Sequence, residues 1–85
     1  MTRDQAYVLL NDIVRDVLEN ETVAVDDATE ATAVGGWDSL AGIGVLAAAE
    51  VRFGVRFRAA EAQRVERIGD LVDLILDNAP RVTAG

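Results

Sequence analysis

Apolar residues recur at spacings of three and four in three stretches of the chain, which predicts three substantial amphipathic helices. The first covers about Asp4–Leu18, the second about Ser39–Phe53 and the last about Ile68–Asn78, with a short helical turn at Ala59–Ala62. Predicted core residues are Val8, Leu10, Ile13, Val14, Val17 and Leu18 in the first helix, Leu40, Ile43, Leu46 and Phe53 in the second, and Ile68, Leu71, Val72, Ile75 and Leu76 in the last.

Residues 19–36 show no sustained period, which predicts a long loop between the first two helices. A brief helical turn is expected from Asp26 or Asp27, and Gly54 is expected to end the second helix as a left-handed cap. Thr2, with Gln5 three residues on, is a predicted cap for the first helix. Three isolated valines are expected to fix the loop to the core: Val23, Val25 and Val34.

These elements predict one all-α domain over residues 1–85, a four-helix bundle with three long helices and a short third helix. Its core is expected within about residues 4–78, with residues 79–85 as a flexible tail after Asn78 and Pro80. The long loop would cross the bundle and let the first two helices lie in similar directions.

The composition disfavours an enzyme. The chain has no cysteine and no histidine, so it lacks a disulfide, a thiolate metal site, and the usual general base and zinc ligand. A catalyst would have to work with carboxylates, arginines, Ser39 and Tyr7 alone. We therefore expect a protein without catalytic activity of its own.

The charge also excludes several kinds of partner. The chain carries fifteen acidic residues, eight arginines and no lysine, for a net charge of −7, which disfavours nucleic-acid binding and fits partners with basic surfaces. No apolar run approaches ~20 residues and no signal-peptide pattern is present, so we expect a cytoplasmic protein that does not enter a membrane. We also expect a monomer. Four arginines form a basic patch in the second half: Arg56, Arg58, Arg64 and Arg67.

The segment Gly35-Gly36-Trp37-Asp38-Ser39-Leu40 leads into the small, apolar stretch Ala41–Val51. Asp38 can cap a helix start, which places the Ser39 hydroxyl in the first turn, near the positive end of the helix. A hydroxyl in that position is suited to modification, although an unmodified serine is also common at a helix start.

The second helix is unusual in its small residues. Gly42 and Gly44 each cost roughly 1 kcal/mol of helix propensity relative to alanine. Such glycines indicate either close packing against another helix or a face that a partner approaches closely, and the sequence alone leaves both open.

Over about Gln5–Asn78 the chain resembles the acyl and peptidyl carrier proteins. Gly36-Trp37-Asp38-Ser39-Leu40 matches the attachment motif of that family at the end of a long loop. Phe53-Gly54-Val55-Arg56-Phe57 is similar to the segment that closes its second helix. Ala60-Glu61-Ala62 and the stretch from Ile68 to Ile75 look like its short third helix and its fourth helix.

This resemblance implies that Ser39 carries a covalent 4′-phosphopantetheine arm, transferred from coenzyme A by a phosphopantetheinyl transferase, which makes the chain a phosphoprotein. Acyl or aminoacyl cargo would be held as a thioester on that arm. Asp38 belongs to the motif, and partner enzymes would dock around Leu40. Trp37 is either a flank of that surface or a core anchor. The remaining expected contacts are Ile43, Gly44 and Glu50.

The small residues of the second helix and Trp37 look more like those of discrete carriers of polyketide or nonribosomal peptide pathways, such as antibiotic biosynthesis. The chain also departs from the family pattern in two ways. Glu50 is nearly alone as an acid on the second helix, and Arg58 stands where the family often has proline. The implied partners are an acyltransferase or adenylation enzyme and a ketosynthase, met mainly through apolar contact. The alternatives are a housekeeping fatty-acid carrier and a helical adaptor that is never modified.

Overall fold

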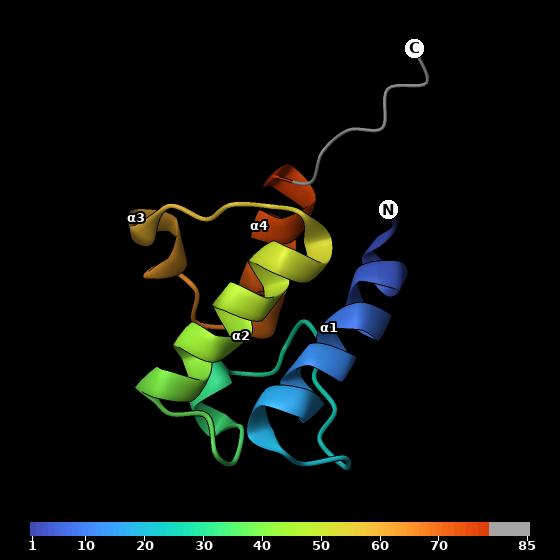
Figure 1. The fold of residues 1–85 in the computed structure, drawn as a ribbon, viewed down its shortest axis with the longest axis vertical. Helices are drawn as coiled ribbons and strands as arrows, with labels where there is room; N and C mark the ends of the chain where they lie inside the picture. Colours follow the sequence, from blue (N-terminus) through green and yellow to red (C-terminus); the bar gives the residue numbers. More distant parts are fainter. Residues whose placement is uncertain (79–85) are drawn as a thin grey trace.

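The computed structural model describes residues 1–78, which form an all-α bundle of four helices (Figure 1). They are α1 (Arg3–Leu18), α2 (Ser39–Phe53), the single-turn α3 (Ala59–Ala62) and α4 (Ile68–Asn78). A 3-10 turn, η1 (Ala31–Ala33), interrupts the loop between α1 and α2. The predicted fold class and helix order are confirmed. The tail predicted at residues 79–85 lies outside the described residues.

Helix α1 runs antiparallel to α2, and α4 runs in the same general direction as α2 (Figure 1). A Cβ at Gly44, in the first half of α2, would lie 3.2 Å from Val17 near the end of α1. The expectation that the first two helices lie in similar directions is therefore wrong. The loop runs back along the bundle to Asp27, which binds Arg3 at the start of α1. It then returns to the end of the bundle where α1 finishes and α2 begins, which explains why the loop is long.

The helix ends follow from local chemistry. Thr2 and Gln5 form the predicted capping box, in which each side chain accepts a hydrogen bond from the other residue's backbone N–H. At the end of α2, Gly54 adopts φ 68° and its N–H donates to the Glu50 carbonyl, as predicted for a left-handed cap. Glu19 ends α1 in the same left-handed region without being a glycine.

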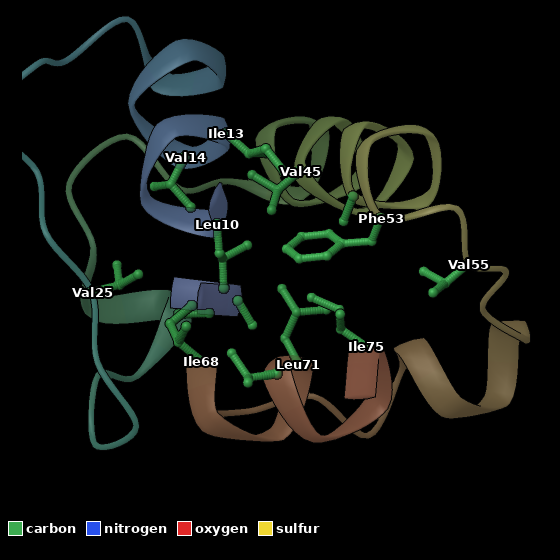
Figure 2. Packing of buried hydrophobic residues seen from close by; sticks show 14 of the residues in the cluster. Leu10, Ile13, Val14, Val25, Val45, Phe53, Val55, Ile68, Leu71 and Ile75 are labelled. Carbon is green, nitrogen blue, oxygen red and sulfur yellow. The ribbon is translucent and has the colours of Figure 1, made fainter. Parts of the chain in front are cut away.

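Side chains from three helices and the loop form one core (Figure 2). Residues of α4 supply its floor, and the predicted Ile68, Leu71, Val72 and Ile75 are all fully buried. The prediction fails for Val8, which is 70% exposed on the outer face of α1. The remaining buried core residues are Ala6, Leu10, Ile13, Val14, Val25, Ala31, Val34, Val45, Ala49, Phe53 and Val55.

The buried face of α2 differs from the predicted one. Leu40 and Ile43 were expected in the core stripe, but they are 78% and 64% exposed. Val45, Ala49 and Phe53 are buried instead. Because α2 is apolar on nearly every side, its sequence period does not determine which side faces the core.

The long loop is held to the bundle by its valines and by specific hydrogen bonds. Val25 and Val34 are buried and Val23 is partly buried, as predicted. Arg15 Nε donates to the Val23 carbonyl at 2.7 Å, and the Asn11 side-chain oxygen accepts from the Val25 N–H at 2.8 Å. A hydrogen-bonded turn begins at Asp26, whereas the 3-10 helix begins only at Ala31.

After this turn the loop pairs with the connection between α3 and α4. Ala31 N donates to the Glu66 carbonyl at 3.0 Å, and Ile68 N donates to the Thr29 carbonyl at 2.8 Å. Gly69 lies directly beneath the loop, because a Cβ there would be only 2.8 Å from the Asp27 carbonyl oxygen. A single backbone contact region therefore links the loop to the start of α4.

A polar cluster fastens the same loop to α1 and α4. The Arg3 guanidinium donates to the Asp27 carboxylate at 2.5 Å and to Asp73 at 2.6 Å, and Tyr7 also donates its hydroxyl to Asp27. The Arg3 guanidinium, followed by the Tyr7 hydroxyl, lowers the pKa of Asp27. At the start of α4, backbone N–H groups of Arg67 and then Glu66 lower the pKa of Asp70.

These lowered pKa values predict acid sensitivity. A carboxylate whose pKa is depressed in the folded state stabilises the fold at pH values above its ordinary pKa of 3.8. That stability is lost as the pH falls through the lower folded-state pKa. We expect Asp27→Asn to lower the urea midpoint at pH 7, and its difference from wild type to shrink steadily below pH ~4.

The matched control is Asp16→Asn, because Asp16 is exposed and has no hydrogen bond or ion pair from its side chain within residues 1–78. It should leave the midpoint at pH 7 nearly unchanged. A D27N midpoint equal to that of wild type at neutral pH, or a difference that stays constant into acid, would show that the Arg3–Asp27 contact does not stabilise the loop.

Candidate functional site

Ser39 is the first residue of α2 and is exposed, and it is the only serine in the chain. The preceding residue, Asp38, caps the helix as predicted: its side chain accepts from the Ala41 N–H at 2.8 Å and its carbonyl accepts from the Gly42 N–H at 2.9 Å. Since Asp38 makes the cap, the Ser39 hydroxyl is not needed for it and points to no partner among residues 1–78.

The start of α2 also leaves backbone donors unused. The N–H groups of Ser39 and Leu40 have no acceptor within the part of the chain that the structure describes. Unpaired N–H groups in a first helical turn, together with the helix dipole, favour a negatively charged group placed beside them. A phosphate on the Ser39 oxygen would therefore lie in a favourable electrostatic position.

Ser39 borders a groove between α2 and α3 with a volume of about 410 Å³. Its floor is Leu71, a fully buried residue of α4, and Gln63 adds an amide to a lining that is otherwise largely apolar. The other large side chains along the groove are Trp37, Ile43, Leu46 and Val65. The groove is thus an extension of the core that opens next to the serine.

Trp37 packs on α2 where Gly42 leaves room for it. A Cβ at residue 42 would lie 3.1 Å from the indole Nε1, so alanine there would press on the ring. The ring is partly buried, contacts the core cluster and lines the groove beside Ser39. Trp37 is therefore an anchor on the core that also lines the groove beside Ser39, and its expected place at the edge of a partner surface stays a prediction.

Gly44 is explained by packing between helices. Its missing side chain lets α2 approach Val17 of α1, to within 3.2 Å of where a Cβ would stand. Gly44 is only partly exposed, and we do not assign it to a docking surface. The sequence left this choice open, and the structure favours the packing explanation.

An exposed apolar stripe follows the outer face of α2, from the residue after Ser39 almost to the end of the helix. Leu40 and Ile43 were expected to contact partners, and both are largely exposed. Val51, which is 81% exposed, was missed, although it follows Leu40 by eleven residues, or about three helical turns. The exposed apolar stripe consists of Leu40, Ile43, Ala47 and Val51.

Glu50, the single acid of α2, has a structural contact. Its carboxylate accepts a hydrogen bond from the Phe57 N–H at 3.0 Å, and the side chain is partly buried. This contact fixes the extended link after α2, in which Val55 is buried and Phe57 half-buried. Glu50 was expected to meet partners, but its carboxylate is already used within the chain.

Residues 1–78 contain neither a candidate metal site nor a candidate membrane-spanning helix. No group of three or more acidic, histidine or cysteine side chains in that range could hold a metal ion. In the same range, no helix is long and apolar enough to cross a bilayer.

Comparison with solved structures identifies an acyl carrier protein-like fold. The solution NMR structure of a holo acyl carrier protein from Geobacter metallireducens matches with 28% sequence identity and a TM-score of 0.78. The match covers 85% of this chain and 83% of that chain. On this similarity the chain is an acyl carrier protein-like carrier and not a catalyst, as predicted. No protein-family model and no curated protein sequence matches it.

Proposed function

We propose that this chain is an acyl carrier protein of polyketide or related natural-product biosynthesis, with a 4′-phosphopantetheine arm on Ser39. The observation that carries the proposal is the placement of this one serine: it is exposed, directly follows the capping Asp38, and borders an apolar groove. The same fold occurs in a holo acyl carrier protein, which supports the arm as the modification.

The attachment chemistry requires only an accessible hydroxyl from this chain. The Ser39 oxygen attacks the phosphorus of coenzyme A that bears the pantetheine, forming a phosphodiester, and 3′,5′-adenosine diphosphate leaves. The transferase supplies the magnesium ion and the base that accepts the serine proton. This division of labour fits a chain that contains neither histidine nor cysteine.

The residues around Ser39 have the properties that such an arm needs. Free N–H groups of Ser39 and Leu40 favour the phosphodiester charge, and Asp38 holds the helix start rigid without using the serine. When bound, the arm supplies a thiol that carries acyl groups as thioesters. The chain then acts by delivery, keeping its cargo at high effective concentration near successive active sites.

The direct test is to incubate the protein with coenzyme A, magnesium and a transferase of broad specificity and to measure the intact mass. A carrier gains one phosphopantetheine, roughly 340 Da. The alternative of an unmodified helical adaptor predicts no gain, even when a known carrier in the same tube is fully converted.

The exposed apolar stripe is the surface we assign to partner enzymes. Ile43 lies in the stripe next to Ser39, whereas the Glu50 carboxylate is bound to Phe57 N–H. With the transferase as partner, we expect Ile43→Ala to raise KM about tenfold, because burying this side chain is worth roughly 1.5 kcal/mol or more. Glu50→Gln, which keeps an acceptor for Phe57, should change KM less than twofold.

Initial rates of loading at several carrier concentrations measure both values. A larger increase in KM for E50Q than for I43A would mean that recognition is electrostatic, as expected for a carrier whose partners bind its acidic side chains. That result would favour the housekeeping fatty-acid alternative over a natural-product carrier.

A further inference from the structure

Positive charge is concentrated in one short segment of this acidic chain. Residues 52–67 contain five of the eight arginines and only two acids, Glu61 and Glu66, although the whole chain has a net charge of −7. We call this the arginine segment; its arginines are Arg52, Arg56, Arg58, Arg64 and Arg67.

These five guanidinium groups are not bound by another side chain or carbonyl in the part of the chain that the structure describes. All five residues are exposed, and none makes a side-chain hydrogen bond or an ion pair within residues 1–78. The other two arginines of that range are engaged: Arg3 with Asp27 and Asp73, and Arg15 with the Val23 carbonyl and Asp12. The arginine segment is therefore free to bind another molecule.

Three of these arginines follow the exposed apolar stripe along the chain. Arg52 follows Val51 in the last turn of α2. Beyond Gly54 the link to α3 is extended, with Val55 and Phe57 directed at the core, so Arg56 and Arg58 alternate to the outside. Figure 1 shows this link leaving the end of α2 and passing over the bundle to α3.

No free carboxylate of α2 opposes this charge. Glu50 is the only acid between Ser39 and Arg52, and its carboxylate accepts from the Phe57 N–H at 3.0 Å. A partner that covers the stripe therefore meets apolar side chains along the helix and unpaired guanidinium groups at its far end.

We propose that the partner enzymes dock with an apolar groove bounded by carboxylates, placed opposite Arg52, Arg56 and Arg58. Guanidinium groups pair with carboxylates in short, charge-assisted, often bidentate hydrogen bonds, which fix the orientation of a docked partner. The net charge of −7 suggests the opposite, a basic partner, but charges close to an interface dominate over distant ones at physiological ionic strength. The identification of the partner as an enzyme rests on the carrier function proposed above. The acidic character of the partner's docking groove is argued from the arginines and does not depend on that function.

The experiment uses two synthetic amphipathic helical peptides with the same apolar face, one flanked by glutamates and the other by lysines. Each is titrated into the isotopically labelled protein at low salt and followed by NMR. We expect the glutamate peptide to bind at least about tenfold more tightly and to shift the amides of residues 51–58. Non-specific attraction to an acidic protein would favour the lysine peptide. Tighter binding of the glutamate peptide is therefore the opposite of what the net charge alone predicts.

Arg56→Gln should weaken binding of the glutamate peptide by about two- to fivefold, the range for one exposed charge pair. Its matched control is Ala24→Glu, which changes the net charge by the same amount at an exposed loop position outside the arginine segment. A24E should leave the affinity unchanged.

Equal or tighter binding of the lysine peptide would overturn the proposal, as would an A24E effect as large as that of R56Q. Failure of both peptides to bind would count against the stripe as a docking surface. The carrier function is tested separately, by the phosphopantetheine mass gain. If the protein preferred the glutamate peptide but gained no mass, it would be an unmodified adaptor that binds an acidic partner.

Discussion

Replacing Leu71 with alanine is expected to lower the free energy of unfolding by about 2–5 kcal/mol, the range for truncating a fully buried leucine. Leu71 has no exposed surface and is both part of the core and the floor of the groove beside Ser39. Small domains of this size have total stabilities of only about 5–10 kcal/mol, so the loss is a large fraction of the fold's stability. Urea unfolding followed by far-UV circular dichroism measures it.

The control for this substitution is Leu40→Ala, because the same change is made at a residue that is 78% exposed. It should alter the free energy of unfolding by no more than about 0.5 kcal/mol. Similar losses for both variants would mean that Leu40, and not only Leu71, contributes to the core, and the assignment of α2's outer face would then be wrong.

Ser39→Ala is expected to abolish phosphopantetheine loading completely while leaving the fold intact. The variant lacks the only serine hydroxyl, so no bond to the pantetheine phosphorus can form there. Its stability should stay within about 0.5 kcal/mol of wild type, because Asp38 and not Ser39 caps α2. Intact-mass analysis over time, together with urea unfolding, measures both quantities.

Thr32→Ala is the matched control, since Thr32 is an exposed hydroxyl residue of η1 with no side-chain hydrogen bond among residues 1–78. It should load at the wild-type rate. Residual loading of S39A at a rate similar to wild type would place the modification on another hydroxyl and remove the basis for the proposed function.

Helix bounds and caps were predictable from sequence because their causes are local. A capping box needs only Thr2 and Gln5, and the Asp38 cap on α2 needs only the residues within one turn of it. The positions of Ser39 and of the α4 core stripe follow in the same way, since α4 has one clearly apolar side.

The orientation of α2 was not predictable, because the helix has apolar or small residues on almost every side. Its rotation is set by contacts that no local pattern records: the indole of Trp37 rests on Gly42, and Val17 of α1 rests on Gly44. These two contacts turn Val45 inward and leave Leu40 on the outside. The same rotation creates the exposed apolar stripe.

Contacts between distant positions were missed for a similar reason. Arg3 binds Asp27 and Asp73, which are 24 and 70 residues away, and such pairs leave no periodic signal. The bond from Phe57 N–H to Glu50 also crosses the helix end, so the sequence indicated a free acid where the structure has an engaged one.

The central claim is that Ser39 bears the carrier's arm, and it is tested most directly by fragmenting the loaded protein in a tandem mass spectrometer. The account predicts that the added roughly 340 Da is found only on fragments that contain residue 39. Full loading with the added mass located on any other residue, or no added mass under conditions that convert a known carrier, would contradict it.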